Sequence, residues 1–153
     1  TRTVYMRGIK ENGFVFYTNY NSDKAKSLEQ NNKVSLHFFW VELERQIRIE
    51  GEVKKVSDTD SDIYFSQRPR ESQLGAWASN QSESLKDRAE LEEKVAYFTA
   101  KFATTEGPRP PHWGGYLVVP NKFEFWQGRP NRLHDRIIFT KSGTSWKKSR
   151  LAP

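Results

Sequence analysis

Apolar side chains occupy every second position in two neighbouring parts of the chain. In residues 34–40, the side chains of Val34, Leu36, Phe38 and Trp40 fall on one face. In residues 44–53 the alternation is cleaner, with Ile47, Ile49 and Val53 facing inward and Gln46, Arg48 and Glu50 facing outward. A period of two predicts half-buried strands, and we expect these two segments to form an antiparallel pair.

Further segments have the composition of strands. Residues 1–9 and 14–19 flank Glu11-Asn12-Gly13, whose Asn-Gly pair is the signal of a tight hairpin. Later in the chain, residues 116–119, 122–127, 133–140 and 145–148 read as strands joined by short turns. The pattern therefore predicts about eight strands.

Helical spacing appears in three places. Ser22 can cap a short helix that runs to about Asn31. Residues 58–65 predict a second helix, which ends before Arg68-Pro69 because the residue before a proline is pushed out of helical geometry. The third helix follows Asp87, which forms a capping box with Glu90. Its apolar stripe consists of Leu91, Val95, Phe98 and Phe102, and Glu90 is spaced to pair with Lys94.

Strands that outnumber three or four inserted helices predict a mainly β fold, an antiparallel barrel with helical decorations. The polar residues 70–84 carry no predicted element, and the proline-rich residues 107–111 form an extended linker. The length of 153 residues fits a single domain over residues 1–153. Thr1 lies in what reads as the middle of a strand, so an upstream segment, with any targeting signal, is expected to be missing.

Composition narrows the chemistry. The 25 Lys and Arg residues exceed the 19 Asp and Glu residues, and the net charge of +6 favours anionic partners. The absence of cysteine excludes disulfides, thiolate metal sites and a cysteine nucleophile. The three histidines are scattered without metal-ligand spacing, so no metal centre is expected. No apolar run approaches the roughly 20 residues needed to cross a bilayer, so no membrane contact is expected.

The segment from Trp126 to Arg136 is the most informative part of the chain. If it is extended, Arg132, His134 and Arg136 point the same way, with Trp126 close behind them across a Gly-Arg-Pro-Asn turn. A cationic wall beside an aromatic ring suits a planar anionic ligand, such as a phosphorylated ring compound or a flavin nucleotide.

Three more clusters carry groups suited to phosphate: Arg2 with Ser22 and Lys24, Tyr64 with Arg68 and Ser72, and Gln81 with Ser82. For any one cluster alone, a solvated surface or a structural ion pair remains the alternative. His37 and His112 are predicted to be structural, and only His134 lies among other candidate residues.

These residues stand in a set of spaced motifs that resembles the pyridoxine (pyridoxamine) 5′-phosphate oxidase family from Arg2 to Pro153. The motifs are Gly13-Phe14-Val15-Phe16-Tyr17-Thr18-Asn19, Glu44-Arg45-Gln46, Tyr64-Phe65 with Arg68-Pro69-Arg70, Ser72-Gln73-x-Gly75-Ala76-Trp77, Gln81-Ser82, Trp113-Gly114-Gly115, Glu124-Phe125-Trp126-Gln127-Gly128, Asn131-Arg132-Leu133-His134-Asp135-Arg136 and Arg150-Leu151-Ala152-Pro153. Many motifs in the right order make this resemblance far more specific than any one of them.

The resemblance implies a split β-barrel of the FMN-binding type and a cytoplasmic homodimer with FMN at the interface. FMN would be held by Arg2, Thr3, Val4, Tyr5, Met6, Arg7, Tyr17, Thr18, Lys24, Gln46, Gln81, Ser82, Trp126 and Arg136. The substrate phosphate would be met by Arg7, Tyr64, Arg68 and Ser72. The ring-clamping motif within residues 113–153 would supply Arg132, Leu133 and His134, of which Arg132 and His134 are the expected catalytic residues.

The implied reaction oxidises pyridoxamine or pyridoxine 5′-phosphate to pyridoxal 5′-phosphate and reduces O2 to H2O2. A flavin- or haem-binding split-barrel protein without oxidase activity is the alternative. A nucleic-acid-binding barrel is disfavoured, because acids are interspersed among the basic residues.

Two positions depart from the pattern of the family. Arg7 stands where the family usually has a lysine for the substrate phosphate, and Asp23 stands where it usually has an arginine near the FMN phosphate. We expect Asp23 to turn outward, Lys24 and Arg2 to carry the charge, and FMN to bind more weakly.

Overall fold

The computed structural model describes residues 1–11 and 13–153, so Asn12 of the predicted hairpin turn lies outside the described residues. Within that part the fold is mainly β with inserted helices, as predicted. Its strands are β1 (Gly8–Lys10), β2 (Gly13–Asn19), β3 (Lys33–Trp40), β4 (Arg45–Lys55), β5 (Trp113–Gln127), β6 (Asp135–Ser142) and β7 (Ser145–Leu151). Its helices are α1 (Asp23–Gln30), α2 (Asp58–Ser66), α3 (Arg70–Ala78), α4 (Arg88–Lys101) and the 3₁₀ turn η1 (Pro130–Arg132).

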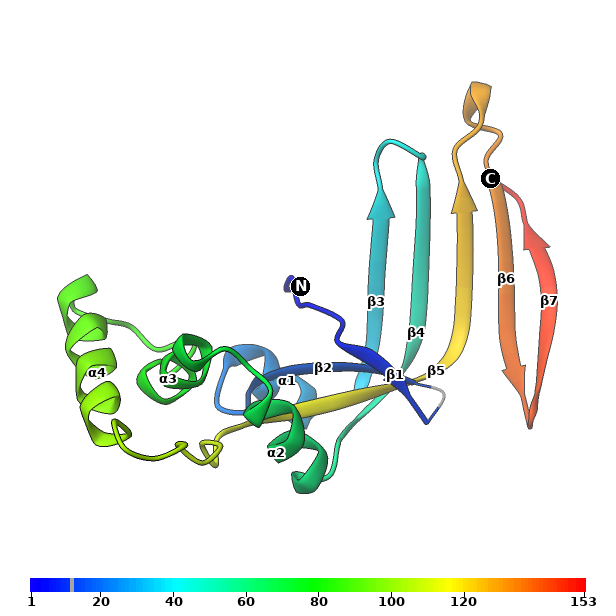
Figure 1. Cartoon of the computed structure of the whole chain (residues 1–153). Coiled ribbons are helices and arrows are strands. Elements are labelled where there is room, and N and C mark those ends of the chain that lie inside the picture. Colours follow the sequence, from blue (N-terminus) through cyan, green and yellow to red (C-terminus); the bar gives the residue numbers. More distant parts are fainter. Residues whose placement is uncertain (12) are drawn as a thin grey trace.

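Strand β5 organises the antiparallel sheet. The strand order is β1-β2-β5-β4-β3, and β6 pairs with both β5 and β7. The first part of β5 pairs with β2, its last part pairs with β6, and β4 follows it along most of its length. The register between β4 and β5 shifts between Glu50 and Gly51, and β5 bends strongly along its length (Figure 1). One strand therefore links the helical end of the molecule to the β6–β7 hairpin.

The core lies where β2, β4, β5 and α1 meet. Phe16, Ala25, Val53, Tyr116 and Val118 form its buried cluster. Val34 and Leu36 of β3 pack against this cluster, which confirms the predicted inner face of that strand. Ile49 and Val53 of β4 are also buried, as the alternation predicts.

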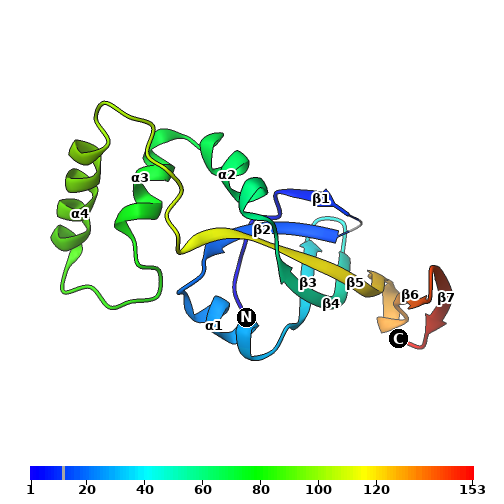
Figure 2. The ribbon, with the colours of Figure 1, turned by 90° about the horizontal axis from the view of Figure 1, so that it is seen from below.

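Helices α2, α3 and α4 gather at one end of the molecule, away from β6 and β7 (Figure 2). The Asp87 side chain accepts a hydrogen bond from the Glu90 N–H, so the predicted N-cap of α4 is confirmed. The Glu90 carboxylate bonds to Lys94, also as predicted, and accepts the N–H of Lys86. The Trp77 ring of α3 contacts Phe98 and Phe102, which gives the apolar stripe of α4 its partner.

Two predictions about elements are wrong. Residues 70–78, read as part of a polar stretch, form helix α3, whose buried side chains are only Leu74 and Ala78. Residues 116–119 and 122–127, read as two strands, belong to the single strand β5, which also takes in Trp113. Pro120 lies at the register shift opposite Gly51, where a proline is tolerated in a sheet.

The predicted bounds also fail at two ends of strands. Residues 1–7 are not part of a strand, and β1 covers only residues 8–10. Strand β6 begins at Asp135 and not at Leu133, because Asn131 and Arg132 have φ angles of 57° and 61° in the left-handed region. The chain therefore leaves η1 in a loop, and the extended geometry expected for Arg132 and His134 does not form.

Candidate functional site

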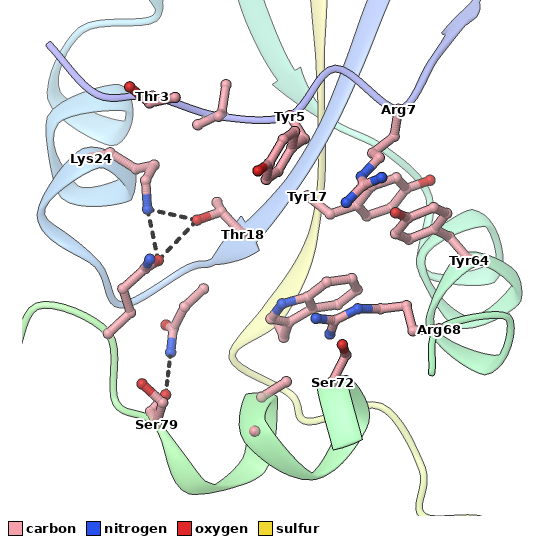
Figure 3. A pocket seen from close by; sticks show the side chains of 16 residues that line it. Thr3, Tyr5, Arg7, Tyr17, Thr18, Lys24, Tyr64, Arg68, Ser72 and Ser79 are labelled. Atoms are coloured by element: carbon pink, nitrogen blue, oxygen red, sulfur yellow. Dashed lines mark hydrogen bonds between the residues drawn. The ribbon is translucent and has the colours of Figure 1, made fainter. Parts of the chain in front are cut away.

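A pocket of about 430 Å³ opens between the N-terminal segment, β2, α2 and α3 (Figure 3). This volume lies within the range of about 300–1,000 Å³ usual for small-molecule sites. Eleven of the predicted site residues line it: Thr3, Val4, Tyr5, Arg7, Tyr17, Thr18, Lys24, Tyr64, Arg68, Ser72 and Gln81. The structure thus brings together three clusters that are far apart in the sequence.

Arg68 dominates one end of the pocket. Its guanidinium lies 4.5 Å from the centre of the Trp113 ring, and burial lowers its pKa. Its Nη1 atom is buried and has no hydrogen-bond partner among the described residues. Tyr64, Ser72 and Arg7 point into the same space (Figure 3). A buried cationic donor without an acceptor is costly, so this end of the pocket is suited to an anion.

Aromatic rings support that end of the pocket. Tyr17 and Tyr64 stack with their ring centres 3.8 Å apart, and Tyr17 lies 5.5 Å from Trp113. Burial raises the pKa of Tyr17, so its phenol stays neutral and keeps its proton. The stack fixes the wall from which Tyr64 and Arg68 reach into the pocket.

Lys24 dominates the other end. Its Nζ donates to Thr18 Oγ1 and to Gln81 Oε1, each at 2.7 Å. Burial, followed by the nearby charge of Arg2, lowers the pKa of Lys24. Gln81 Oε1 also accepts from the Thr18 hydroxyl at 3.1 Å, and within the described part of the chain the Gln81 amide nitrogen donates to no protein acceptor. Lys24 Nζ also donates to Ser22 Oγ at 3.1 Å, so this end offers the positive charge of Lys24 and the Gln81 amide N–H to a second anionic group.

Asp23 is exposed and does not line the pocket, which agrees with the expectation that it turns outward. Its Oδ2 lies 3.3 Å from an Arg2 guanidinium nitrogen, and its backbone N–H donates to Ser82 Oγ. Both side chains of the ion pair are more than half exposed. Arg2 is therefore partly neutralised, and Lys24 is left as the main positive charge facing this part of the pocket.

A second group of predicted residues lies at the far end of β5. Gln46 of β4, Trp126 of β5 and Arg136 of β6 stand in one row across the sheet. Gln46 Oε1 lies 3.0 Å from His37 Nε2, so His37 contacts a candidate residue. Within one chain this row does not join the pocket, because Trp113 and Trp126 occupy opposite ends of the bent strand (Figure 1).

His134 joins this second group through Trp126. The two ring centres are 4.7 Å apart, which confirms the predicted proximity across the turn. The Arg129 backbone N–H donates to His134 Nδ1 at 3.2 Å. Because Nδ1 accepts, a neutral His134 carries its proton on Nε2 and presents a donor to its surroundings.

Arg132 and Leu133 complete the loop before His134, and both are exposed. The prediction that Arg132, His134 and Arg136 share one face of a strand is wrong, because only Arg136 belongs to β6. Arg136 is half-buried, and its Nε donates to Glu124 Oε1 at 2.7 Å.

Sequence reasoning missed several residues that line the pocket: Asn19, Gly75, Ala76, Ser79 and Trp113. Trp113 occurs in the sequence analysis only within the motif Trp113-Gly114-Gly115, and no pattern in the sequence marks it as a pocket residue. Of the remaining predicted residues, Met6 lines a neighbouring groove with Arg2, and Ser82 bonds to Asp23 beside the Lys24 end.

Within residues 1–11 and 13–153, no three His, Asp or Glu side chains are grouped as they would be around a metal ion. No helix in the same residues is both long and apolar enough to cross a bilayer.

Two family models match the chain. Residues 1–102 match the model described as pyridoxamine 5′-phosphate oxidase, and residues 113–153 match the pyridoxine 5′-phosphate oxidase C-terminal dimerisation region. A pyridoxine/pyridoxamine 5′-phosphate oxidase of Rubrobacter xylanophilus is 53% identical over 99% of this chain and 70% of its own length. A protein of the same name from Actinobacillus pleuropneumoniae is 53% identical over 100% of this chain and 73% of its own length.

Solved structures agree on the fold. PhzG from Burkholderia lata 383, in complex with tetrahydrophenazine-1-carboxylic acid, is 30% identical with a TM-score of 0.91, over 99% of this chain and 74% of that chain. A pyridoxamine 5′-phosphate oxidase-related, FMN-binding protein from Nostoc punctiforme is 16% identical with a TM-score of 0.76. The likeness covers 99% of this chain and 80% of that chain. The predicted split-barrel fold is confirmed by these likenesses.

Proposed function

Because the chain belongs to the pyridoxamine 5′-phosphate oxidase family, we propose that it oxidises pyridoxamine and pyridoxine 5′-phosphate to pyridoxal 5′-phosphate. O2 accepts the two electrons and becomes H2O2; with the amine substrate, water enters and ammonia leaves. The cofactor is FMN, which when bound supplies the acceptor for two electrons from the substrate C4′ carbon.

The Arg68 end of the pocket carries this proposal. A substrate phosphate there would give the buried Nη1 of Arg68 its acceptor, with Tyr64, Ser72 and Arg7 as further donors. Charge-assisted hydrogen bonds contribute about 1.5–3 kcal/mol each. Anchoring the phosphate far from C4′ uses this binding energy to orient the reacting carbon. An arginine in place of lysine at Arg7 keeps the charge and offers a forked donor.

The Lys24 end fits the phosphate of FMN. Lys24, Thr18 and Gln81 are joined by hydrogen bonds, and Ser82 and Arg2 lie beside them. Burial lowers the pKa of Lys24 and so disfavours its charged form. A phosphate dianion at this end would favour the charged form and raise that pKa again.

We assign the flavin ring to the second group, contributed by a second copy of the chain. The match of residues 113–153 to a dimerisation region supports a homodimer. In this arrangement Trp126, Gln46 and Arg136 of one subunit meet the ring of the FMN held by Lys24 of the other. Each active site is then built from both chains.

Arg132 and His134 are assigned to the substrate ring. His134 presents Nε2–H, so in the observed conformation it can orient a ring oxygen but cannot take up a proton at Nε2. Removal of a proton by His134 first requires Arg129 N–H to release Nδ1. Arg132 carries a fixed positive charge and suits an anionic ring oxygen.

Anaerobic titration tests the proposed reaction. The purified protein should be yellow, and its flavin absorbance should bleach when pyridoxamine 5′-phosphate is added without oxygen. Air should restore the colour and produce H2O2. Pyridoxamine without its phosphate serves as the control and should bleach the flavin far more slowly. A yellow protein that the phosphate ester leaves unbleached would favour the alternative, a flavin-binding split-barrel protein without oxidase activity.

Replacing Arg132 by leucine should lower kcat by about 10²-fold while FMN stays bound, because the substrate ring loses its charged clamp. Stopped-flow bleaching and the flavin content of the purified variant measure the two effects separately. Arg129→Leu is the matched control in the same loop, since its guanidinium bonds to Asp135. Undiminished turnover in Arg132→Leu would remove Arg132 from the reaction.

A further inference from the structure

Glu124 is a buried carboxylate to which the proposed reaction gives no role. It lies in β5 with an exposed fraction of 6%, two residues before Trp126 and on the same face of the sheet. A carboxylate removed from water stays ionised only when it is paired and hydrogen-bonded. Two arginines, Arg48 and Arg136, bind the Glu124 carboxylate.

The two oxygens of Glu124 bind different strands. Oε1 accepts from Arg136 Nε at 2.7 Å, and Oε2 accepts from an Arg48 guanidinium nitrogen at 2.8 Å. The hydrogen bond from Arg136 is the main cause that lowers the pKa of Glu124. Strands β4, β5 and β6 are thus joined on one face by a carboxylate between two guanidinium groups.

The pairing register of β5 and β6 shows in which direction the Arg136 side chain runs. The residue directly opposite Arg136 is Trp126, and the residue opposite Ile138 is Glu124. The Arg136 side chain therefore runs diagonally along the sheet, past Trp126, to reach Glu124. Its Nη1 also donates to the Ala152 carbonyl at 3.1 Å. Two acceptors from separate segments fix both the direction and the rotation of the guanidinium plane.

This clamp leaves one edge of Arg136 available. Among the residues that the structure describes, Nε and Nη1 donate to protein acceptors and Nη2 donates to none. The fork geometry of a guanidinium is rigid, so fixing Nε and Nη1 also fixes the direction of the Nη2 hydrogens.

We propose that Glu124 is a positioning residue for the flavin, which aims Arg136 at an electron-rich atom of the FMN ring beside Trp126. The inference rests on the proposed function, because it takes Arg136 as a contact of FMN. Glu124 itself does not touch the flavin; it holds the donor that does, before the cofactor arrives.

A double-mutant cycle on FMN affinity tests the proposal. Apo-dimers of the native chain, Glu124→Gln, Arg136→Gln and the double variant are titrated with FMN, and the quenching of flavin fluorescence gives Kd. Losing an aligned charge-assisted bond should raise Kd about tenfold or more in each single variant. The double variant should be no weaker than Arg136→Gln, because the two side chains act through one contact.

Glu50→Gln is the matched control. Glu50 lies on the same face of β4 and pairs with Arg48 and Lys122, but it makes no contact with Arg136. The Glu50→Gln variant should bind FMN with a Kd within about twofold of the native value. Glu124→Asp keeps the charge but withdraws it by one methylene, so it should fall between the native chain and Glu124→Gln. It also serves as the test if Glu124→Gln fails to fold.

The outcomes separate the two levels of the proposal. If Arg136→Gln weakens FMN but Glu124→Gln and Glu124→Asp bind it normally, the positioning role is wrong and the proposed function stands. If the losses in the two single variants add in the double variant, Glu124 acts independently of Arg136 and the proposal is also overturned. If Arg136→Gln binds FMN normally, Arg136 is not a flavin contact. The assignment of Gln46, Trp126 and Arg136 to the flavin ring is then wrong, and the positioning role of Glu124 is wrong with it.

Discussion

Asp23 carries a negative charge next to Lys24 and outside the pocket that Lys24 lines. It occupies the first position of α1 and holds Arg2 at 3.3 Å, beside the Lys24 end of the pocket. A carboxylate at the start of a helix is favoured by the helix dipole. If the FMN phosphate binds at the Lys24 end, as proposed, the same carboxylate would compete with it for Arg2 and repel it. We therefore expect Asp23 to stabilise the helix and to weaken the binding of the cofactor.

Replacing Asp23 by asparagine should therefore separate these two effects. We expect the FMN Kd to fall about two- to fivefold, since an exposed pair contributes up to about 1 kcal/mol. The melting temperature of the apo-protein should fall slightly as the helix loses its N-terminal charge. Fluorescence titration and thermal melts measure the two changes. Glu29→Gln makes the same charge change in α1, where Glu29 pairs with Lys55, and should leave Kd unchanged; an equal gain there would contradict the local explanation.

At the scale of single residues, the sequence predicted which side chains lie close together but not the directions in which they point. The spacing of Trp126 and His134 predicted their contact, and the ring centres do lie 4.7 Å apart. The shared face of Arg132, His134 and Arg136 failed because Asn131 and Arg132 take left-handed backbone angles after Pro130. Asparagine tolerates the left-handed region, so Asn131 is compatible with its angle, but nothing in the sequence pattern indicates the same angle at Arg132.

At the scale of elements, a strong alternation of apolar residues predicted strands correctly, whereas residues that suggested a break in a strand led to wrong bounds. The alternation in residues 44–53 correctly placed β4 and its buried face. Pro120-Asn121 suggested a turn, but the register shift opposite Gly51 lets β5 continue through it. Helix α3 was missed because its polar sequence buries only Leu74 and Ala78, and the N-cap, Pro69, makes no side-chain hydrogen bond.

Gly51 makes that register shift possible. A Cβ built on Gly51 would stand 2.2 Å from the Val119 carbonyl oxygen and 2.9 Å from Pro120 Cα, both of them backbone atoms. Gly51→Ala should therefore lower the free energy of unfolding by about 2 kcal/mol or more, because the backbones of β4 and β5 must separate. Chemical denaturation of the apo-protein measures this loss. Gly75→Ala is the control, because its methyl group meets no atom within 4 Å and it lies inside helix α3. It should not destabilise the protein and should add up to about 1 kcal/mol of stability. A Gly51→Ala variant as stable as the native chain would show that the bend relaxes freely.

At the scale of the whole molecule, the two groups of site residues lie apart within one chain. The pocket that contains Arg68 and Lys24 is also lined by Trp113 at the start of β5, and the Trp126 row lies at the other end of this strand. The predicted motifs include both groups but do not say how the groups would be divided between subunits, because a sequence motif does not record which copy of the chain supplies a side chain.

A mixed dimer tests this division. Arg68→Leu and Arg132→Leu should each be almost inactive as homodimers. A mixed dimer, purified by two different affinity tags, should regain about half of the native activity, because one of its two sites holds both native residues. Oxygen consumption with pyridoxamine 5′-phosphate measures the recovery. A dimer of two native chains that carry the same tags sets the reference. An inactive mixed dimer would mean that Arg68 and Arg132 serve the same site from one chain.

The continuity of β5 sets a rule for changing the length of this protein. Deleting or inserting one residue between Trp113 and Trp126 would reverse the side of the sheet to which every later side chain points. Trp126 would then leave the face that carries Gln46 and Arg136. Length variation, whether by engineering or by natural drift, should therefore accumulate in the segments on either side of this strand, such as residues 103–111, and spare the strand itself.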